Sequence, residues 1–134
     1  MAAHALPIRV YYEDTDAAGI AYHASYLRFA ERGRTEFLRD LGFDHGSLAR
    51  GHGILFAVAR CAVEFLRPAR LDDLLVVRTE VSTLTGTRIE MAQQVERGDT
   101  TVARLAVTLA ALDPSSLRPT RLPAPLRAAF ALHG

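Results

Sequence analysis

The chain has 134 residues, of which 49% are hydrophobic and 23% are charged, and its formal net charge is +1. This length and composition predict a single domain over residues 1–134 with an ordinary apolar core, and they exclude a disordered or fibrous chain. Charges of both signs are scattered along the sequence, which indicates neither nucleic acid nor an anionic membrane as a partner.

Two residue types restrict the chemistry further. The chain contains no lysine, which excludes P-loop phosphate binding and Schiff-base catalysis. Cys61 is its only cysteine, so no disulfide framework forms within the chain, and the apolar run around it predicts a buried thiol. No apolar segment is long enough to span a bilayer, and the opening six residues are too short for a signal peptide. We therefore expect a cytoplasmic protein without membrane insertion.

The first predicted elements are a strand and a long helix. β-branched and aromatic side chains predict a strand over Ile8 to Glu13. Apolar or small residues then recur at helical spacing from His23 to Leu41, and Gly42 supplies a stop signal. The pattern allows a second, short helix around His45 to Arg50.

The second half of the chain alternates with a period of two residues, as strands do. Every odd position from Leu55 to Phe65 is apolar, which predicts a strand with one fully buried face. Further alternating runs follow over Leu75 to Ser82, Ile89 to Glu96 and Thr101 to Leu112. Their short connections require antiparallel strands. A helix around Leu126 to Leu132 is expected to pack on the outside.

These elements predict an α+β fold, in which an antiparallel sheet of about five strands curls around one long central helix. The sheet face turned away from that helix also carries apolar residues, namely Phe56, Val58, Leu74, Val76, Ala106 and Ala110. Leaving so much apolar surface in water is unfavourable, so we predict a homo-oligomer.

Polar chemistry concentrates between Tyr12 and His23, directly ahead of the long helix. The segment holds three carboxylates, Glu13, Asp14 and Asp16, together with a turn at Gly19. Short polar residues at this place most often form a turn and cap the helix. Crowded carboxylates repel one another, however, which favours a functional site. A metal site built from Asp14, Asp16 and His23 is an alternative, although no second histidine lies nearby.

The stretch from residue 9 to residue 36 resembles the 4-hydroxybenzoyl-CoA thioesterase family of hotdog-fold proteins. Within that family the chain looks most like the acyl-CoA thioesterases associated with the bacterial Tol-Pal cell-envelope system. The likeness is carried by Tyr11 to Asp16, Gly19, Tyr22-His23, Tyr26-Leu27, Glu31 to Glu36 and Phe65 to Ala69. The resemblance implies a long helix wrapped by an antiparallel sheet, and dimers or tetramers with active sites between subunits.

The resemblance also implies roles for three residues. Asp16 matches the family's catalytic carboxylate, while His23 and Tyr12 match a histidine and a tyrosine implicated in the Tol-Pal branch. A thioester carbonyl at the helix start would meet free N–H groups, with that of His23 or its neighbour as the donor. Asp16 would then attack the carbonyl carbon or activate a water as general base. Asp14 is assigned to turn structure.

The substrate implied by the resemblance is acyl-CoA, with an acyl-carrier protein as a possible partner. Because CoA carries phosphates, we expect arginine contacts, with Arg67, Arg70 and Arg88 as candidates, and Gly19 in the substrate-binding turn. No metal or other cofactor is expected, since CoA is part of the substrate. Three alternatives stay open: a non-catalytic acyl-CoA or acyl-carrier-protein binding module, a 4-hydroxybenzoyl-CoA thioesterase and a hotdog hydratase.

Overall fold

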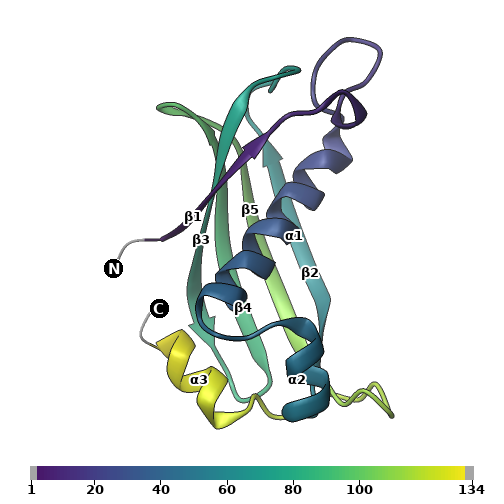
Figure 1. Ribbon diagram of the computed structural model, residues 1–134, viewed down its shortest axis with the longest axis vertical. Helices are drawn as coiled ribbons and strands as arrows, with labels where there is room; N and C mark the ends of the chain where they lie inside the picture. Colours follow the sequence, from purple (N-terminus) through teal and green to yellow (C-terminus); the bar gives the residue numbers. More distant parts are fainter. Residues whose placement is uncertain (1–2, 132–134) are drawn as a thin grey trace.

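A computed structural model describes residues 3–131 of the chain (Figure 1). One sheet, one long helix and two short helices make up the α+β class that the sequence predicts. In chain order the elements are β1 (His4–Arg9), a 3-10 turn (Tyr12–Asp14), α1 (His23–Asp40), α2 (His45–Gly51), β2 (Leu55–Phe65), β3 (Leu74–Leu84), β4 (Arg88–Arg97), β5 (Thr100–Leu112) and α3 (Ala124–Ala131).

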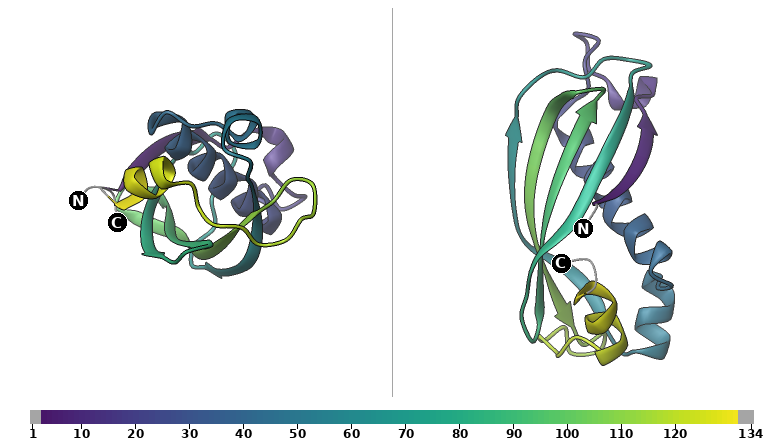
Figure 2. Two further views of the ribbon diagram at one scale, coloured as in Figure 1. Left: turned by 90° about the horizontal axis from the view of Figure 1, so that it is seen from below. Right: turned by 90° about the vertical axis from the view of Figure 1, so that its left-hand side faces the viewer.

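The five strands form one antiparallel sheet in the order β1-β3-β4-β5-β2. The sheet curls around α1, which crosses its inner face mainly over β1, β3 and β4 (Figures 1 and 2). The apolar stripe of α1 lies against this face and forms the core with it, through Tyr26, Phe29, Ala30, Phe37 and Leu38. This arrangement confirms the predicted fold, with the helix within one residue of its expected end.

The strands β2 and β3 follow each other in the chain but are not neighbours in the sheet. β2 pairs with β5 at one edge, whereas β3 lies between β1 and β4. The connection of residues 66–73 therefore crosses the end of the sheet instead of forming a hairpin. β2 and β3 nevertheless run in opposite directions, as predicted. Three antiparallel pairings lead from β3 through β4 and β5 to β2, and an odd number of such pairings leaves the first and last strands antiparallel.

The first strand lies earlier than predicted, at His4–Arg9 instead of Ile8 to Glu13. Pro7 argues against a strand at these positions, yet β1 is an edge strand that pairs only with β3, and edges tolerate proline. The chain then leaves the sheet, because the N–H of Asp14 turns back to the carbonyl of Tyr11 and closes the 3-10 turn.

β2 differs from the prediction of one fully buried face. Most of its residues are exposed or half-buried, and the thiol-bearing Cys61, expected to be buried, is exposed. Val58 and Phe65 are each 53% exposed. The physical reason is that β2 is an edge strand beyond the main contact of α1 with the sheet, so this protomer does not cover it.

α3 also differs from the prediction, because it packs into the core instead of on the outside. Leu126 and Phe130 are fully buried, and the ring of Phe130 meets that of Phe37 edge-on at 5.8 Å between centroids. Leu132, the last residue of the expected helix, lies outside the described residues. The short helix thus closes the end of the sheet opposite the start of α1 (Figure 1).

α1 lies close against the sheet at Gly33, where a Cβ atom would lie 2.6 Å from Cγ1 of Val77. Beside it, the fully buried Gln93 donates from Nε2 to the carbonyl of Ala30 and accepts at Oε1 from the Arg34 guanidinium at 3.1 Å. The glycine therefore lets a helix backbone reach a polar side chain of the sheet. A hydrogen bond to Gln93 fixes the Arg34 side chain against the sheet.

Candidate active site

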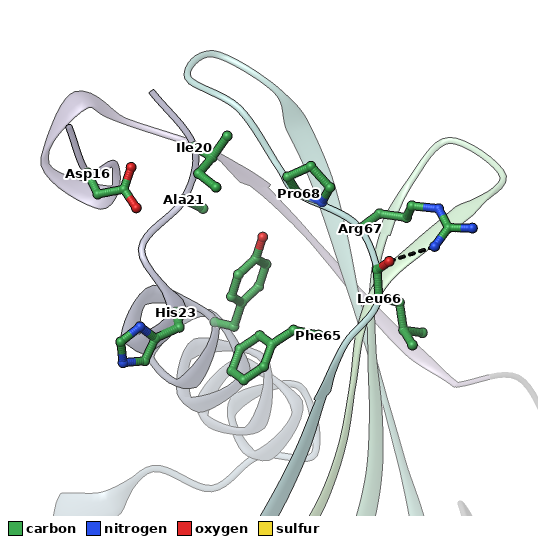
Figure 3. A pocket seen from close by; sticks show the side chains of 9 residues that line it. Asp16, Ile20, Ala21, His23, Phe65, Leu66, Arg67 and Pro68 are labelled. Atoms are coloured by element: carbon green, nitrogen blue, oxygen red, sulfur yellow. Dashed lines mark hydrogen bonds between the residues drawn. The ribbon is translucent and has the colours of Figure 1, made fainter. Parts of the chain in front are cut away.

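A cavity of about 360 Å³ lies at the N-terminal end of α1 (Figure 3). Its walls come from the turn that precedes α1, from the first turn of α1 and from the crossing connection after β2. They include Asp16, Ile20, Ala21, His23, Tyr26, Phe65, Leu66, Arg67 and Pro68. Three residues that the sequence singles out, Asp16, His23 and Arg67, are therefore brought to one cavity from segments far apart in the chain.

Hydrogen bonds to backbone carbonyls hold these walls in place. The N–H of Ala21 donates to the carbonyl of Ala69 at 2.7 Å, and Ile20 forms an isolated bridge with Arg70. The guanidinium of Arg97, at the end of β4, donates to the carbonyl of Pro68 at 2.7 Å. The turn before α1 and the crossing connection thus hold each other in place.

The carboxylate of Asp16 is positioned by a tight turn. The N–H of Gly19 donates to the Asp16 carbonyl at 3.0 Å, and Gly19 has φ +77°, which favours glycine. Oδ1 of Asp16 accepts the N–H of Ala18 at 2.8 Å. Within residues 3–131 no basic side chain comes within 4.0 Å of this carboxylate. Asp16 is therefore an exposed anion with one oxygen left for another partner.

Asp14, two residues earlier, has the structural role assigned to it. Its side chain is nearly fully buried, accepts the N–H of Tyr11 at 2.8 Å, and lies 3.3 Å from Nη2 of Arg28. Its carbonyl accepts the N–H of Tyr22 and the hydroxyl of Ser25. A carboxylate held in this way is unsuited to binding a metal, and no group of three potential metal-ligating side chains occurs in the described part of the chain.

α1 begins at His23, and its N-cap residue is Tyr22. The Tyr22 side chain accepts no hydrogen bond from the N–H groups of the first turn. Among the described residues no acceptor is found for the N–H groups of His23 and Ala24. They open toward the cavity end of the helix, where the helix dipole also favours negative charge. The His23 ring is exposed, lies 4.2 Å from the Tyr22 ring and makes no hydrogen bond within residues 3–131.

The other predicted site residues lie at different distances from the cavity. Arg67 lines it and donates to the carbonyl of Leu66 at 2.7 Å. Arg70 is exposed on the same connection, but its side chain is not part of the cavity wall. Arg88 starts β4, whereas the far end of β4 reaches Pro68, so strand geometry places Arg88 roughly 30 Å away within the protomer. Tyr12 is 82% exposed and does not line the cavity.

The sequence analysis assigned no site role to Tyr26 or Phe65. Both count as apolar core residues in the periodicity, yet both line the cavity, and their rings meet at 5.7 Å between centroids. Burial raises the pKa of the Tyr26 hydroxyl above its usual value, partly opposed by a hydrogen bond from the N–H of Ala69. One sequence signal could have identified Tyr26: a tyrosine in an apolar helix stripe is expected to be buried, and its hydroxyl then needs a polar partner.

Comparison with known proteins adds the family. The model of the thioesterase superfamily matches residues 18–104. The chain belongs to the thioesterase superfamily. The matched range includes His23, Tyr26 and the whole crossing connection, and it begins two residues after Asp16.

Individual relatives of this thioesterase-superfamily chain cover nearly all of it. It is 43% identical to the acyl-CoA thioesterase YbgC of Haemophilus influenzae, over 92% of this chain and 91% of that protein. It is 42% identical to the acyl-CoA thioester hydrolase YbgC of Escherichia coli, over 92% of each chain. The crystal structure of a probable thioesterase from Bartonella henselae, 42% identical, superposes with a TM-score of 0.87 and covers 91% of this chain and 100% of that one.

None of the helices within residues 3–131 carries an apolar stretch of the length needed to cross a lipid bilayer.

Proposed function

We propose that this protein is an acyl-CoA thioesterase, which hydrolyses the thioester to a free carboxylic acid and CoA. The observation that supports this function best is the unpaired Asp16 carboxylate at a cavity that also contains the open N-terminus of α1. The family and the relatives of 42–43% identity support the same reaction.

The proposed reaction places the thioester carbonyl at the start of α1. In one route the Asp16 carboxylate attacks the carbonyl carbon, and the carbonyl electron pair moves onto oxygen. The N–H groups of His23 and Ala24 stabilise this charge. The C–S bond then breaks, CoA leaves as a thiolate, and water hydrolyses the resulting mixed anhydride. In the other route Asp16 takes a proton from a water that attacks the carbonyl carbon directly.

The ring of His23 has a supporting role in this proposal. An imidazole nitrogen can donate or accept a hydrogen, so this ring can protonate the departing thiolate or orient the water. Its exposed ring, without a hydrogen-bond partner among the described residues, leaves both nitrogens available. We expect His23→Gln to reduce kcat by about 10²-fold or more and to remove one limb of its pH profile, measured with a saturating acyl-CoA.

The test of Asp16 uses a substitution that keeps its local contact. Asp16→Asn retains an oxygen that can accept the N–H of Ala18, so the turn is preserved while the anion is lost. We expect kcat/KM to fall about 10²- to 10⁴-fold in a disulfide-exchange assay for released CoA. Glu13→Gln is the matched control, because this neighbouring carboxylate is exposed and does not line the cavity. Activity of Asp16→Asn equal to wild type would contradict the proposal.

Isotope labelling tests the mixed-anhydride route. A single turnover in ¹⁸O-labelled water that leaves label in the Asp16 carboxylate supports the mixed anhydride. Label found only in the product acid is the result expected of the general-base route, and also of an anhydride that water opens at the substrate's carbonyl carbon. Intact-protein and peptide mass spectrometry after one turnover measures this directly.

Other functions for the same fold give different products. A non-catalytic module for acyl-CoA or acyl-carrier protein would bind acyl-CoA and release no thiol. A hydratase would change the acyl double bond and leave the thioester intact. A panel of aliphatic acyl-CoA chain lengths, with 4-hydroxybenzoyl-CoA included, distinguishes these and defines the acyl specificity.

We also propose that the chain is a homo-oligomer, either a dimer or a tetramer built from two dimers. The edge strand β2 supports this, because Val58 and Phe65 stay exposed on it although its sequence is that of a buried strand. Phe65 also lines the cavity, so a partner that covers β2 would reach the site. Aliphatic and aromatic side chains left in water at an edge favour association.

Four further proposals come with the resemblance. The protein acts in the cytoplasm, where CoA esters are made, and it needs no metal or other cofactor. An acyl-carrier protein can present the acyl group in place of CoA. The protein is also associated with the Tol-Pal cell-envelope system through a shared pathway. Fractionation of cells tests its location, and activity assays with acyl-carrier-protein thioesters test the carrier protein as substrate.

A further inference from the structure

The hydroxyl of Tyr26 is held rigidly at the wall of the cavity. The residue is 4% exposed, and its ring meets Phe29 at 6.0 Å and Phe65 at 5.7 Å between centroids. Its oxygen accepts the N–H of Ala69 at 3.1 Å. The ring contacts and this hydrogen bond fix both the position and the orientation of the hydroxyl oxygen.

The hydrogen of the same hydroxyl is not donated to any acceptor among residues 3–131. A phenol carries one donor as well as its acceptor sites, and Ala69 uses only an acceptor site. Leaving a buried donor without an acceptor is unfavourable by about 1–3 kcal/mol, which favours donation of this hydrogen to a group bound in the cavity. Burial raises the pKa of Tyr26, which keeps this hydrogen in place at neutral pH.

The cavity that Tyr26 lines is the one that contains Asp16 and the first residue of α1. We propose that the Tyr26 hydroxyl donates a hydrogen bond to the reacting thioester group, as a third donor beside the N–H groups of His23 and Ala24. This inference rests on the proposed thioesterase function and adds a catalytic residue to it. Tyr26 contributes a hydrogen bond and transfers no proton, because a phenol less acidic than a thiol does not protonate a thiolate.

A preorganised donor of this kind acts mainly in the transition state. Removing one such donor lowers kcat by about 10²- to 10³-fold in well-studied sites. We expect Tyr26→Phe to lower kcat by about 10- to 10³-fold with KM changed less than threefold. A purely structural role would instead lower the thermal midpoint and affect kcat and KM together. Tyr11→Phe is the matched control, since the Tyr11 side chain is exposed and does not line the cavity.

Tyr26→Phe also removes the acceptor of the Ala69 N–H and can fail to fold. A second variant avoids this problem by replacing Tyr26 with 3-fluorotyrosine or 3,5-difluorotyrosine, which keep the oxygen and its hydrogen bond to Ala69. Fluorine makes the phenol more acidic, so the donor ionises at lower pH. We expect a new alkaline limb in the pH profile of kcat that moves to lower pH with each added fluorine.

The pH profile must be compared with that of wild type, because other ionisable groups face Tyr26. These are Arg97 and Asp73, which act on its pKa, and Asp16, His23 and Arg67 in the cavity wall. Their contributions are common to all fluorinated forms. Only the limb that shifts with fluorination belongs to Tyr26.

The outcomes separate this inference from the proposed function. If wild type releases no CoA from any acyl-CoA, the thioesterase function is wrong. If wild type is active, Asp16→Asn is inactive, and Tyr26→Phe keeps kcat within twofold, only the role of Tyr26 is wrong. A pH profile that does not move between the two fluorinated forms also overturns it.

Discussion

Gly33 offers a direct test of how tightly α1 packs on the sheet. Replacing it with alanine puts a methyl group 2.6 Å from Cγ1 of Val77 and 3.1 Å from Oγ1 of Thr79. Carbon atoms prefer about 3.5–4.0 Å, so roughly 1 Å must be regained by moving buried groups. Val77 and Thr79 are fully buried, and their β-branched side chains have few rotamers to choose from.

The magnitude follows from two opposing terms. Overpacking a core in this way costs about 1–3 kcal/mol, while alanine in place of glycine favours the helix by about 1 kcal/mol. Thr79 is held by a hydrogen bond from Gln93 and cannot move easily, so the overpacking cost lies in the upper part of its range. After the gain in helix propensity is subtracted, we expect Gly33→Ala to lower the free energy of unfolding by about 1–2 kcal/mol. Val77→Ala alone removes two methyl groups and should cost about 2–3 kcal/mol.

The double variant provides the decisive measurement. Val77→Ala vacates the space that the new methyl group at position 33 needs, so the two changes should compensate each other by about 1–2 kcal/mol. Urea unfolding followed by circular dichroism, at one protomer concentration, gives all four values. Gly51→Ala is the control, because nothing lies within 4 Å of its Cβ position in α2. Additive effects of the two substitutions, within about 0.5 kcal/mol, would refute this account of the packing.

Three further predictions concern the edge strand, a helix cap and the site turn. Val58→Lys on β2 should reduce the mass in solution to that of one protomer in light scattering, whereas Leu117→Lys, which alters an equally exposed loop residue, should not. Asp44 caps α2, and the N–H of Ser47 lowers the pKa of its carboxyl, so its stabilisation is complete above the unfolded pKa near 3.8 and is lost as pH falls through the folded value. Asp44→Ala should therefore lower the urea midpoint at pH 7, and the difference from wild type should shrink below pH 3.8. Asp14→Ala removes a buried acceptor and should lower the free energy of unfolding by about 1–3 kcal/mol in the same assay, with Asp16 still present.

The elements with strong periodicity could be predicted from the sequence. The long helix begins at His23 as expected, because its apolar stripe has one period over eighteen residues. The later strands were found in the same way. β1 was misplaced because its strand identity comes from pairing with β3 and not from its own residues, among which Pro7 argues against a strand. Pairing partners far apart in the chain leave no local signal.

Burial was the less predictable property. Alternation correctly showed that β2 has an apolar face, but it could not show that β2 is an edge strand in the protomer. The exposure of Cys61 follows from that position alone. α3 was misjudged for the converse reason, because only the assembled fold shows the space at the end of the sheet that Phe130 fills.

The candidate site was partly predictable. Asp16, His23 and Arg67 meet at one cavity, and Asp14 serves the turn. The role of Tyr26 depends on the crossing connection, which supplies the N–H of Ala69 from 43 residues away. No pattern within the helix reveals that contact.

The backbone hydrogen bonds that join the turn before α1 to the crossing connection have a consequence for substitutions in the cavity wall. The N–H of Ala21 donates to the carbonyl of Ala69, and Ile20 forms a main-chain bridge with Arg70, so both contacts use backbone atoms and not side chains. Side chains on these two segments, such as Ile20 and Leu66, can change without loosening the walls of the cavity. Single substitutions at these two positions should therefore change the shape of the cavity while the frame that carries Asp16 stays intact.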